Sequence, residues 1–162
     1  MEEGSRPARP EDIPRIVELA REGIAELSVT KGGAVWARRE ARAEPIGASL
    51  VAVLDDPAAA MVVGTIDDTV VGYGVVRAEM LRDGALLGVV DDLYVEEGCR
   101  AVWVGEVIMD DLLAWCRTQG CMGVDSLALP GNRATKNFFE RFGLVARAIV
   151  VHKSLIEPEA SP

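Results

Sequence analysis

The fold is decided by the stretch ALLGVVDDLYVEEGCRAVWVG, residues 85–105. Its first half is rich in β-branched and other apolar residues and is interrupted only by Asp91 and Asp92, which indicates a strand. A short polar loop follows, and a new apolar pattern at helical spacing starts at Val104. The sequence therefore predicts a strand that leads into a helix, and the N-terminus of a helix is suited to binding an anion.

The helix after this loop has one apolar face. That face consists of Val104, Val107, Ile108, Leu112, Trp115 and Cys116. Gly120 is typical of a helix end, and a second apolar run, 122–129, follows at once. A strand, a helix and a strand joined this closely predict a right-handed parallel βαβ unit, which offers a ligand the carboxyl ends of its strands.

A hairpin is expected before this unit, over residues 58–66 and 69–80. Asp67 and Asp68 lie between the two runs and form a suitable two-residue turn. Gly72 and Gly74 within the second run predict a bend or a close approach of another segment.

The remaining elements surround the hairpin and the unit. Asn132 is a suitable N-cap for a short amphipathic helix that ends at Gly143. The other expected elements are a strand at 5–8, helices that start at 13, 34 and 48, with the second running to 44, and a closing β-rich strand at 144–155. Together they predict an α/β (α+β) fold with one domain, 1–156, followed by a flexible acidic tail, 157–162.

Composition narrows the class of protein. The chain has 17 basic and 26 acidic residues among 162, a net charge of −9, which disfavours nucleic acids and anionic membranes and favours cationic substrates. Three cysteines and one histidine are too few and too irregularly spaced for a zinc site or a disulfide framework, so no metal is expected. No apolar run is long enough to cross a membrane and no signal peptide is evident, so we expect a cytoplasmic protein.

The motifs resemble those of the GNAT superfamily of acetyl-CoA-dependent N-acetyltransferases. The resemblance rests on the strand Asp91-Asp92-Leu93-Tyr94-Val95, on Arg100 and Gly105 after it, and on the later helix with Asn132, Phe138, Phe139 and Gly143. It implies a mixed, mostly antiparallel sheet of six to seven strands with a central parallel βαβ unit and flanking helices. It also implies transfer of an acetyl group from acetyl-CoA to a primary amine, on a small molecule or a peptide, by direct attack. A homodimer is a further expectation, because exposed sheet edges often pair.

The resemblance assigns expected roles to residues. Backbone groups of Leu93, Tyr94 and Val95 would hold the pantetheine arm of the cofactor. The pyrophosphate would lie against Arg100 and the turn formed by Ala101, Val102, Trp103, Val104, Gly105 and Glu106. The other side of the cofactor would face Asn132, Lys136 and Phe138.

Three residues are candidates for proton transfer. Asp91 and Asp92 are the only acids inside the central strand, and neighbouring positions of a strand point to opposite faces. Asp91 is the first candidate for the base or the amine anchor, and Asp92 is the second. Tyr94 is the phenolic donor nearest to them. The structural alternatives are that the acids mark a bulge or a solvated strand end and that Tyr94 belongs to the core.

Two residues depart from the family pattern. Trp103 stands where the first loop glycine is usual, so its indole must swing aside, stack on the cofactor or block it. Phe139 stands where a tyrosine usually protonates the leaving thiolate, and phenylalanine has no proton to give. The alternative function is therefore a GNAT-like acyl-CoA-binding or regulatory module with weak or no turnover, and a plain structural partner protein is a third.

Overall fold

The computed structural model describes residues 1–156. Its elements are β1 (Glu3–Pro7), the 3-10 turn η1 (Pro10–Asp12), α1 (Ile13–Ser28), α2 (Gly33–Arg39), α3 (Ile46–Asp55), β2 (Ala59–Ile66), β3 (Thr69–Met80), β4 (Leu86–Val95), the 3-10 turn η2 (Glu97–Cys99), α4 (Val104–Gln119), β5 (Gly123–Ser126) and α5 (Arg133–Arg141). None of the helices within these residues combines the length and the apolar character needed to span a bilayer.

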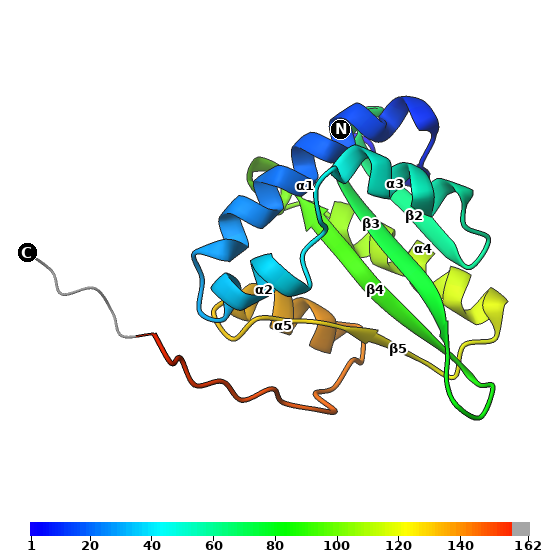
Figure 1. Ribbon diagram of the computed structural model, residues 1–162. Helices are drawn as coiled ribbons and strands as arrows, with labels where there is room; N and C mark the ends of the chain where they lie inside the picture. Colours follow the sequence, from blue (N-terminus) through cyan, green and yellow to red (C-terminus); the bar gives the residue numbers. More distant parts are fainter. Residues whose placement is uncertain (157–162) are drawn as a thin grey trace, which may run out of the picture.

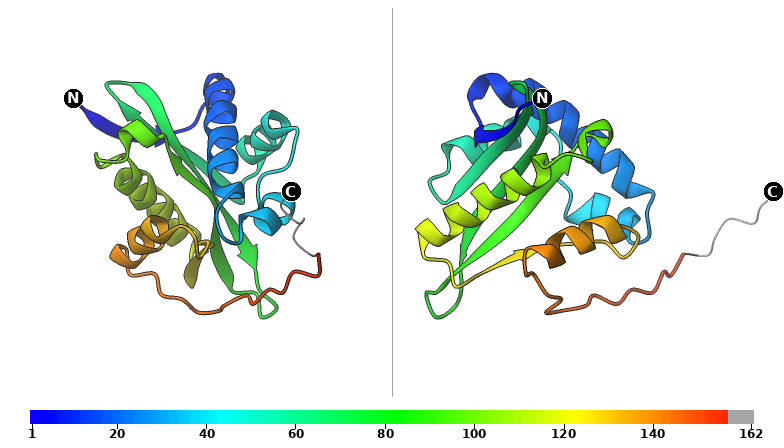
Figure 2. Two further views of the ribbon diagram at one scale, coloured as in Figure 1. Left: turned by 90° about the vertical axis from the view of Figure 1, so that its left-hand side faces the viewer. Right: turned by 180° about the vertical axis from the view of Figure 1, so that it is seen from behind.

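A single five-stranded sheet, in the order β1-β2-β3-β4-β5, separates two layers of helices (Figures 1 and 2). On one face, α1 and α3 bury Ile16, Leu19 and Leu50 against β2 and β3. On the other face, α4 buries Ile108 and Leu112 against β3 and β4. The strands thus alternate their side chains between two apolar cores, as a sheet covered on both faces requires.

The hairpin of β2 and β3 forms as predicted. Asp67 and Asp68 make its turn and both have positive φ, 46° and 64°, which matches the twist of the flanking strands. Gly74 confirms the predicted close approach, because a Cβ there would come within 2.8 Å of both Ile108 and Leu112. Gly64 on β2 is closer still, with Val104 at 2.5 Å from such an atom. These glycines let α4 lie directly on the sheet.

The strands β4 and β5 run parallel and α4 connects them. Their pairing extends only from Leu87–Gly123 to Val90–Ser126. Beyond Val90, β4 continues to Val95 with β3 on one side only, while the chain after β5 diverges toward α5 (Figure 1). Within residues 1–156, this divergence leaves the last five residues of β4 without a second strand beside them.

The structure corrects two expectations about the elements. The sheet has five strands in the described part of the chain rather than six to seven, because residues 144–156 form no strand although their composition favours one. The second helix ends at Arg39 rather than at residue 44, and Arg42 instead turns inward to bind Asp92. The expected tail at 157–162 lies outside the described residues.

Candidate active site

The centre of the site is a β-bulge in β4. The pairing with β3 shifts between Val75 and Val76, so that Asp92 lies opposite Val75, Val90 lies opposite Val76, and Asp91 has no partner. Val90 packs in the core beneath α4, whereas Asp92 binds side chains on the other face, although positions two apart in a regular strand share a face. The bulge therefore replaces the simple alternation expected for the two acids.

Asp92 is the anchor of a buried network. Arg42 donates to both carboxylate oxygens, at 2.9 Å from Nε and 2.5 Å from Nη2, and its side chain is only 12% exposed. The Tyr73 hydroxyl donates to Oδ2 at 2.8 Å. Burial and the charge of Asp92 raise the pKa of Tyr73 well above its usual value, so this phenol stays protonated. With three donors on its oxygens, Asp92 is a structural ion-pair partner rather than a free base.

Asp91 lies in a more open position. Its side chain is 33% exposed and accepts a hydrogen bond from Arg77 Nε at 2.9 Å. Burial raises the pKa of Asp91 above its usual value, and the neighbouring Asp92 adds to this, although Arg77 acts in the opposite direction. A carboxylate with a raised pKa accepts a proton more readily, which is a property of a general base.

Tyr94 belongs to a second cluster at the end of β4. Its hydroxyl donates to Glu26 Oε2 at 3.3 Å, and the guanidinium of Arg100 stacks 5.2 Å from its ring centre. Arg100 donates to both oxygens of Glu26 at 2.7 Å, and its Nε donates to the Val95 carbonyl at 2.7 Å. Burial, with the charge of Glu26, raises the pKa of Tyr94 to about 12. Tyr94 is thus protonated at neutral pH and remains able to donate a proton.

The turn before α4 carries free backbone donors. In the described part of the chain, no protein oxygen accepts a hydrogen bond from the backbone N–H groups of residues 101–106, and no side chain caps the helix. Neither Ala101 nor Trp103 has a positive φ, so this backbone does not require glycine at either position. The Trp103 side chain is 67% exposed and points away from the core. The donors fit a pyrophosphate, which is the acidic part of acetyl-CoA.

The later helix contributes packing next to this turn. The ring of Phe138 lies 3.4 Å from the position of a Cβ on Gly105, and Glu106 accepts a hydrogen bond from Arg141 at 3.2 Å. Asn132 caps α5 by accepting from the Thr135 N–H at 3.3 Å. Lys136 faces solvent, where it pairs with Glu140 at 3.5 Å. Phe138 and Glu106 therefore lie at the turn, whereas Asn132 and Lys136 make contacts within their own helix.

The structure also places Phe139. Its side chain is 6% exposed and packs edge-to-face against Phe138, with ring centres 5.7 Å apart. Phe139 is thus a core residue at the position where the family pattern has a tyrosine.

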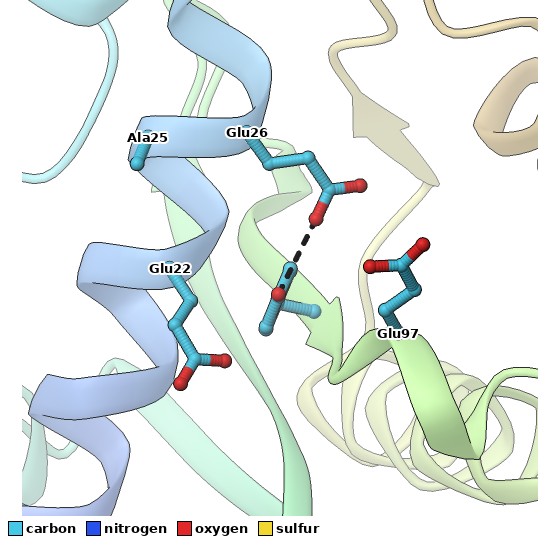
Figure 3. Close-up of a pocket in the computed structure, with 5 residues that line it drawn as sticks. Glu22, Ala25, Glu26 and Glu97 are labelled. Atoms are coloured by element: carbon cyan, nitrogen blue, oxygen red, sulfur yellow. Dashed lines mark hydrogen bonds between the residues drawn. The ribbon is translucent and has the colours of Figure 1, made fainter.

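A pocket opens between α1 and the end of β4. It has a volume of about 500 Å³ and is lined by Glu22, Ala25, Glu26, Tyr94 and Glu97. Figure 3 shows Glu22 and Glu26 leaving α1 on the side that faces Glu97. Arg100 already balances the charge of Glu26, so the negative charge that this hollow offers a cation comes from Glu22 and Glu97.

Sequence reasoning missed several of these residues. Glu22 and Glu26 are four apart on α1 and therefore share a helix face, which is a signal that a search for paired acids could have found. Glu97 is the second residue after the central strand and was available to the same search. Arg42 gives no local signal, because its partner Asp92 is 50 residues away.

Comparisons with known proteins identify the family and the fold. A family model of the GNAT acetyltransferases matches residues 22–144. A search of curated protein sequences found no match. Among solved structures, glucosamine-6-phosphate N-acetyltransferase from Arabidopsis thaliana is similar with a TM-score of 0.69 and 18% identity, covering 96% of this chain and 100% of that one.

Two further solved structures share the fold. An acetyltransferase from Trypanosoma brucei has a TM-score of 0.67 and 18% identity, with 95% of this chain and 100% of that chain covered. AAC(6')-Iy, solved in complex with the bisubstrate analogue CoA-S-monomethyl-acetylneamine, has a TM-score of 0.74 and 12% identity, with 95% and 98% covered. At such identities the likeness concerns the fold alone, while the family model matches most of the chain. The chain belongs to the GNAT family of acetyltransferases.

Proposed function

We propose that this protein transfers an acetyl group from acetyl-CoA to a primary amine that carries a second positive charge. The observation that carries the proposal is the pocket lined by Glu22, Glu26 and Glu97. Glu97 lies four residues before the first residue of the turn with free N–H groups. A diamine or a lysine-containing peptide is opposite in charge to Glu22 and Glu97, the two pocket carboxylates other than the one paired with Arg100. The bisubstrate complex of AAC(6')-Iy, which contains CoA, supports the cofactor half of the proposal.

The chain's own groups would hold acetyl-CoA along two surfaces. The free edge of β4 after Val90 offers backbone groups to the pantetheine arm, as an added strand would. The N–H groups of residues 101–106 and the positive end of α4 meet the pyrophosphate. Acetyl-CoA supplies the thioester carbon that the amine attacks.

In this proposal two side chains of β4, Asp91 and Tyr94, transfer the protons. An alkylammonium has a pKa of about 10.4 and must lose a proton before it attacks. Asp91, with its raised pKa, accepts that proton, directly or through a water molecule. The amine nitrogen then bonds to the carbonyl carbon, the C–S bond breaks, and the thiolate takes a proton from Tyr94. The second proton of the attacking nitrogen passes to the Tyr94 oxygen, so the phenol is restored and the products are the neutral amide and the CoA thiol.

A panel of amines tests the acceptor class. Release of free CoA thiol is measured with a diamine and with a monoamine of equal chain length, for the wild type and for Glu22→Gln. Removal of one partly exposed charge contributes about 1 kcal/mol, so we expect KM for the diamine to rise about fivefold in the variant, with little change for the monoamine.

The matched control is Glu18→Gln. Glu18 is also an exposed acid of α1, one turn before Glu22, and it does not line the pocket. Equal effects of the two variants, or a wild type that prefers the monoamine, would contradict the proposed acceptor.

A second candidate is an acyl-CoA-binding module without turnover. The position of Phe139 favours it, because that buried ring offers no proton and the Tyr73 hydroxyl is already bound to Asp92. Calorimetry separates the two functions. Binding of acetyl-CoA with no CoA release for any amine supports the module, and a Tyr94→Phe variant that binds acetyl-CoA normally but releases CoA more slowly supports the enzyme.

A further inference from the structure

A second pocket opens at the edge of β2, apart from the acidic pocket. It has a volume of about 430 Å³, and its walls come from the end of β1, the first half of β2, the last turn of α3 and the middle of α4 (Figure 1). Ligand pockets in proteins typically have about 300 to 1,000 Å³ and combine apolar walls with a few polar groups. This β2 pocket shares no lining residue with the acidic pocket, and β3 separates β2 from β4.

The β2 pocket exists because β1 is shorter than the strand with which it pairs. The last register pair of the two strands is Pro7 with Val62. The chain then turns into η1, so within residues 1–156 no strand lies beside Ala59 and Ala60 on that side of β2. Both of these side chains are small, so the edge of β2 stays open between α3 and α4.

Apolar side chains from both faces of the sheet line the β2 pocket. Val62 belongs to the core under α4, whereas Met61 belongs to the core under α1 and α3. Leu54 of α3 and Trp115 of α4 form opposite walls, and both are only partly buried. The pocket therefore offers aliphatic and aromatic surface, and an apolar group gains free energy by covering it.

Asp111 is the charged group of this pocket. It lies on α4 one turn before Trp115, and its Oδ2 accepts a hydrogen bond from the Ser5 hydroxyl at 2.6 Å. Among the described residues Ser5 is its only hydrogen-bond partner, and a hydroxyl carries no charge. None of the residues that line the pocket is basic. The charge of the Asp111 carboxylate is therefore left for a cation.

The end of α3 adds negative charge on the other side of the β2 pocket. The last turn of α3 contains Val53 and Leu54, which line the pocket, and no basic residue. Asp55 ends the helix and Asp56 follows it. Because the C-terminal end of a helix carries a partial negative charge, this wall also favours a cation.

We infer that the β2 pocket binds a small monoamine with an apolar body, its ammonium group on Asp111 and its body between Leu54 and Trp115. The face of an indole also attracts a cation, which suits the same ligand. A neutral ligand of equal shape would leave the charge of Asp111 without a partner, so the pocket distinguishes an amine from an alcohol. The inference does not depend on the proposed acetyl transfer, because it concerns a different site and needs no acetyl-CoA.

Nuclear magnetic resonance of the full chain tests this site. The chain has three tryptophans and so three indole N–H signals, of which Trp115→Phe identifies the one from the pocket. We expect 2-phenylethylamine to shift the Trp115 signal until it saturates. The alcohol of the same shape, 2-phenylethanol, should bind about fivefold more weakly, because it lacks the ion pair with a partly exposed carboxylate.

Asp111→Asn tests the role of the charge, because it keeps the shape of the side chain. We expect its affinity for 2-phenylethylamine to fall about fivefold, to the affinity for the alcohol. The matched control is Asp110→Asn, since Asp110 is the neighbouring exposed acid of α4 and does not line the pocket. This control should bind the amine as the wild type does.

Ala60→Leu tests the place of binding. The larger side chain fills the β2 pocket, so the amine should no longer shift the Trp115 signal, while far-UV circular dichroism verifies the fold. Three results would overturn the inference. They are a wild-type Trp115 signal that 2-phenylethylamine does not move, equal affinities for the amine and the alcohol, and equal losses in Asp111→Asn and Asp110→Asn.

Discussion

Asp91 and Asp92 show how neighbouring residues of one type acquire different chemistry. One extra residue in β4 sends Asp92 into the buried network with Arg42 and Tyr73, and leaves Asp91 at a partly exposed place beside Arg77. A buried carboxylate that satisfies a buried guanidinium is expensive to remove, because the remaining charge has no partner.

We therefore predict that Asp92→Asn lowers the free energy of unfolding by about 3 kcal/mol, because Arg42 stays buried without its counter-charge. Asp91→Asn removes a partly exposed ion pair and should lower the free energy of unfolding by about 1 kcal/mol or less. Urea denaturation of both variants measures the difference. Equal losses in the two variants would show that the bulge does not separate their roles.

At the scale of elements, α4 packs closely against the sheet because glycines on the strands leave room for it. A Cβ on Gly64 would lie 2.5 Å from Val104 and 2.6 Å from Ile108, both of which are fully buried. An added methyl group has no space there unless the helix moves away from β2. Because α4 begins at the turn with the free N–H groups, its position also sets the position of that turn.

Gly64→Ala should accordingly lower the free energy of unfolding by about 1 to 3 kcal/mol through overpacking. Thermal and urea unfolding give the value. Gly98→Ala is the comparison, since nothing lies within 4 Å of a Cβ at that position, and its effect should be about 0.5 kcal/mol or less. A Gly64→Ala variant as stable as the wild type would mean that α4 is not tightly seated.

The sequence located most elements because their signals are local. The acids at 67 and 68 adopt the turn that two such residues between apolar runs predict, and Asn132 caps α5 as its side chain allows. The prediction of a closing strand at 144–155 was wrong, although the composition of this segment favours a strand. A strand needs a neighbouring strand to pair with. The nearest one in sequence, β5, is only four residues long, and residues 144–156 contact it through the ion pair of Arg147 with Asp125.

At the scale of the whole molecule, the net charge of −9 favours the approach of cations. Three of the acidic side chains, Glu22, Glu26 and Glu97, line one pocket, and Arg100 balances the charge of Glu26. Fields of this kind raise the local concentration of cations and are screened by salt over about 10 Å at 0.1 M.

We predict that KM for a diamine acceptor rises with added sodium chloride more steeply than KM for a monoamine. The reason is that the diamine has two charges in the field of Glu22 and Glu97, and salt weakens each attraction. Steady-state CoA release at constant pH gives both slopes. Parallel slopes would indicate that the pocket does not distinguish the two amines by charge.

The sequence by itself determined the order of strand, turn and helix around residues 85–105, the hairpin before them and the family resemblance, because periodicity, turn residues and caps act over a few neighbouring positions. The tertiary structure alone decided which charges meet. Arg42 binds Asp92 across 50 residues and Glu26 binds Arg100 across 74, and no local pattern encodes such pairs. It also decided that Asp91 sits at a bulge, that Tyr94 rather than Tyr73 lines the pocket, and that residues 144–156 form no strand. Ion pairs and strand edges depend on distance in space, which the chain acquires only when it folds.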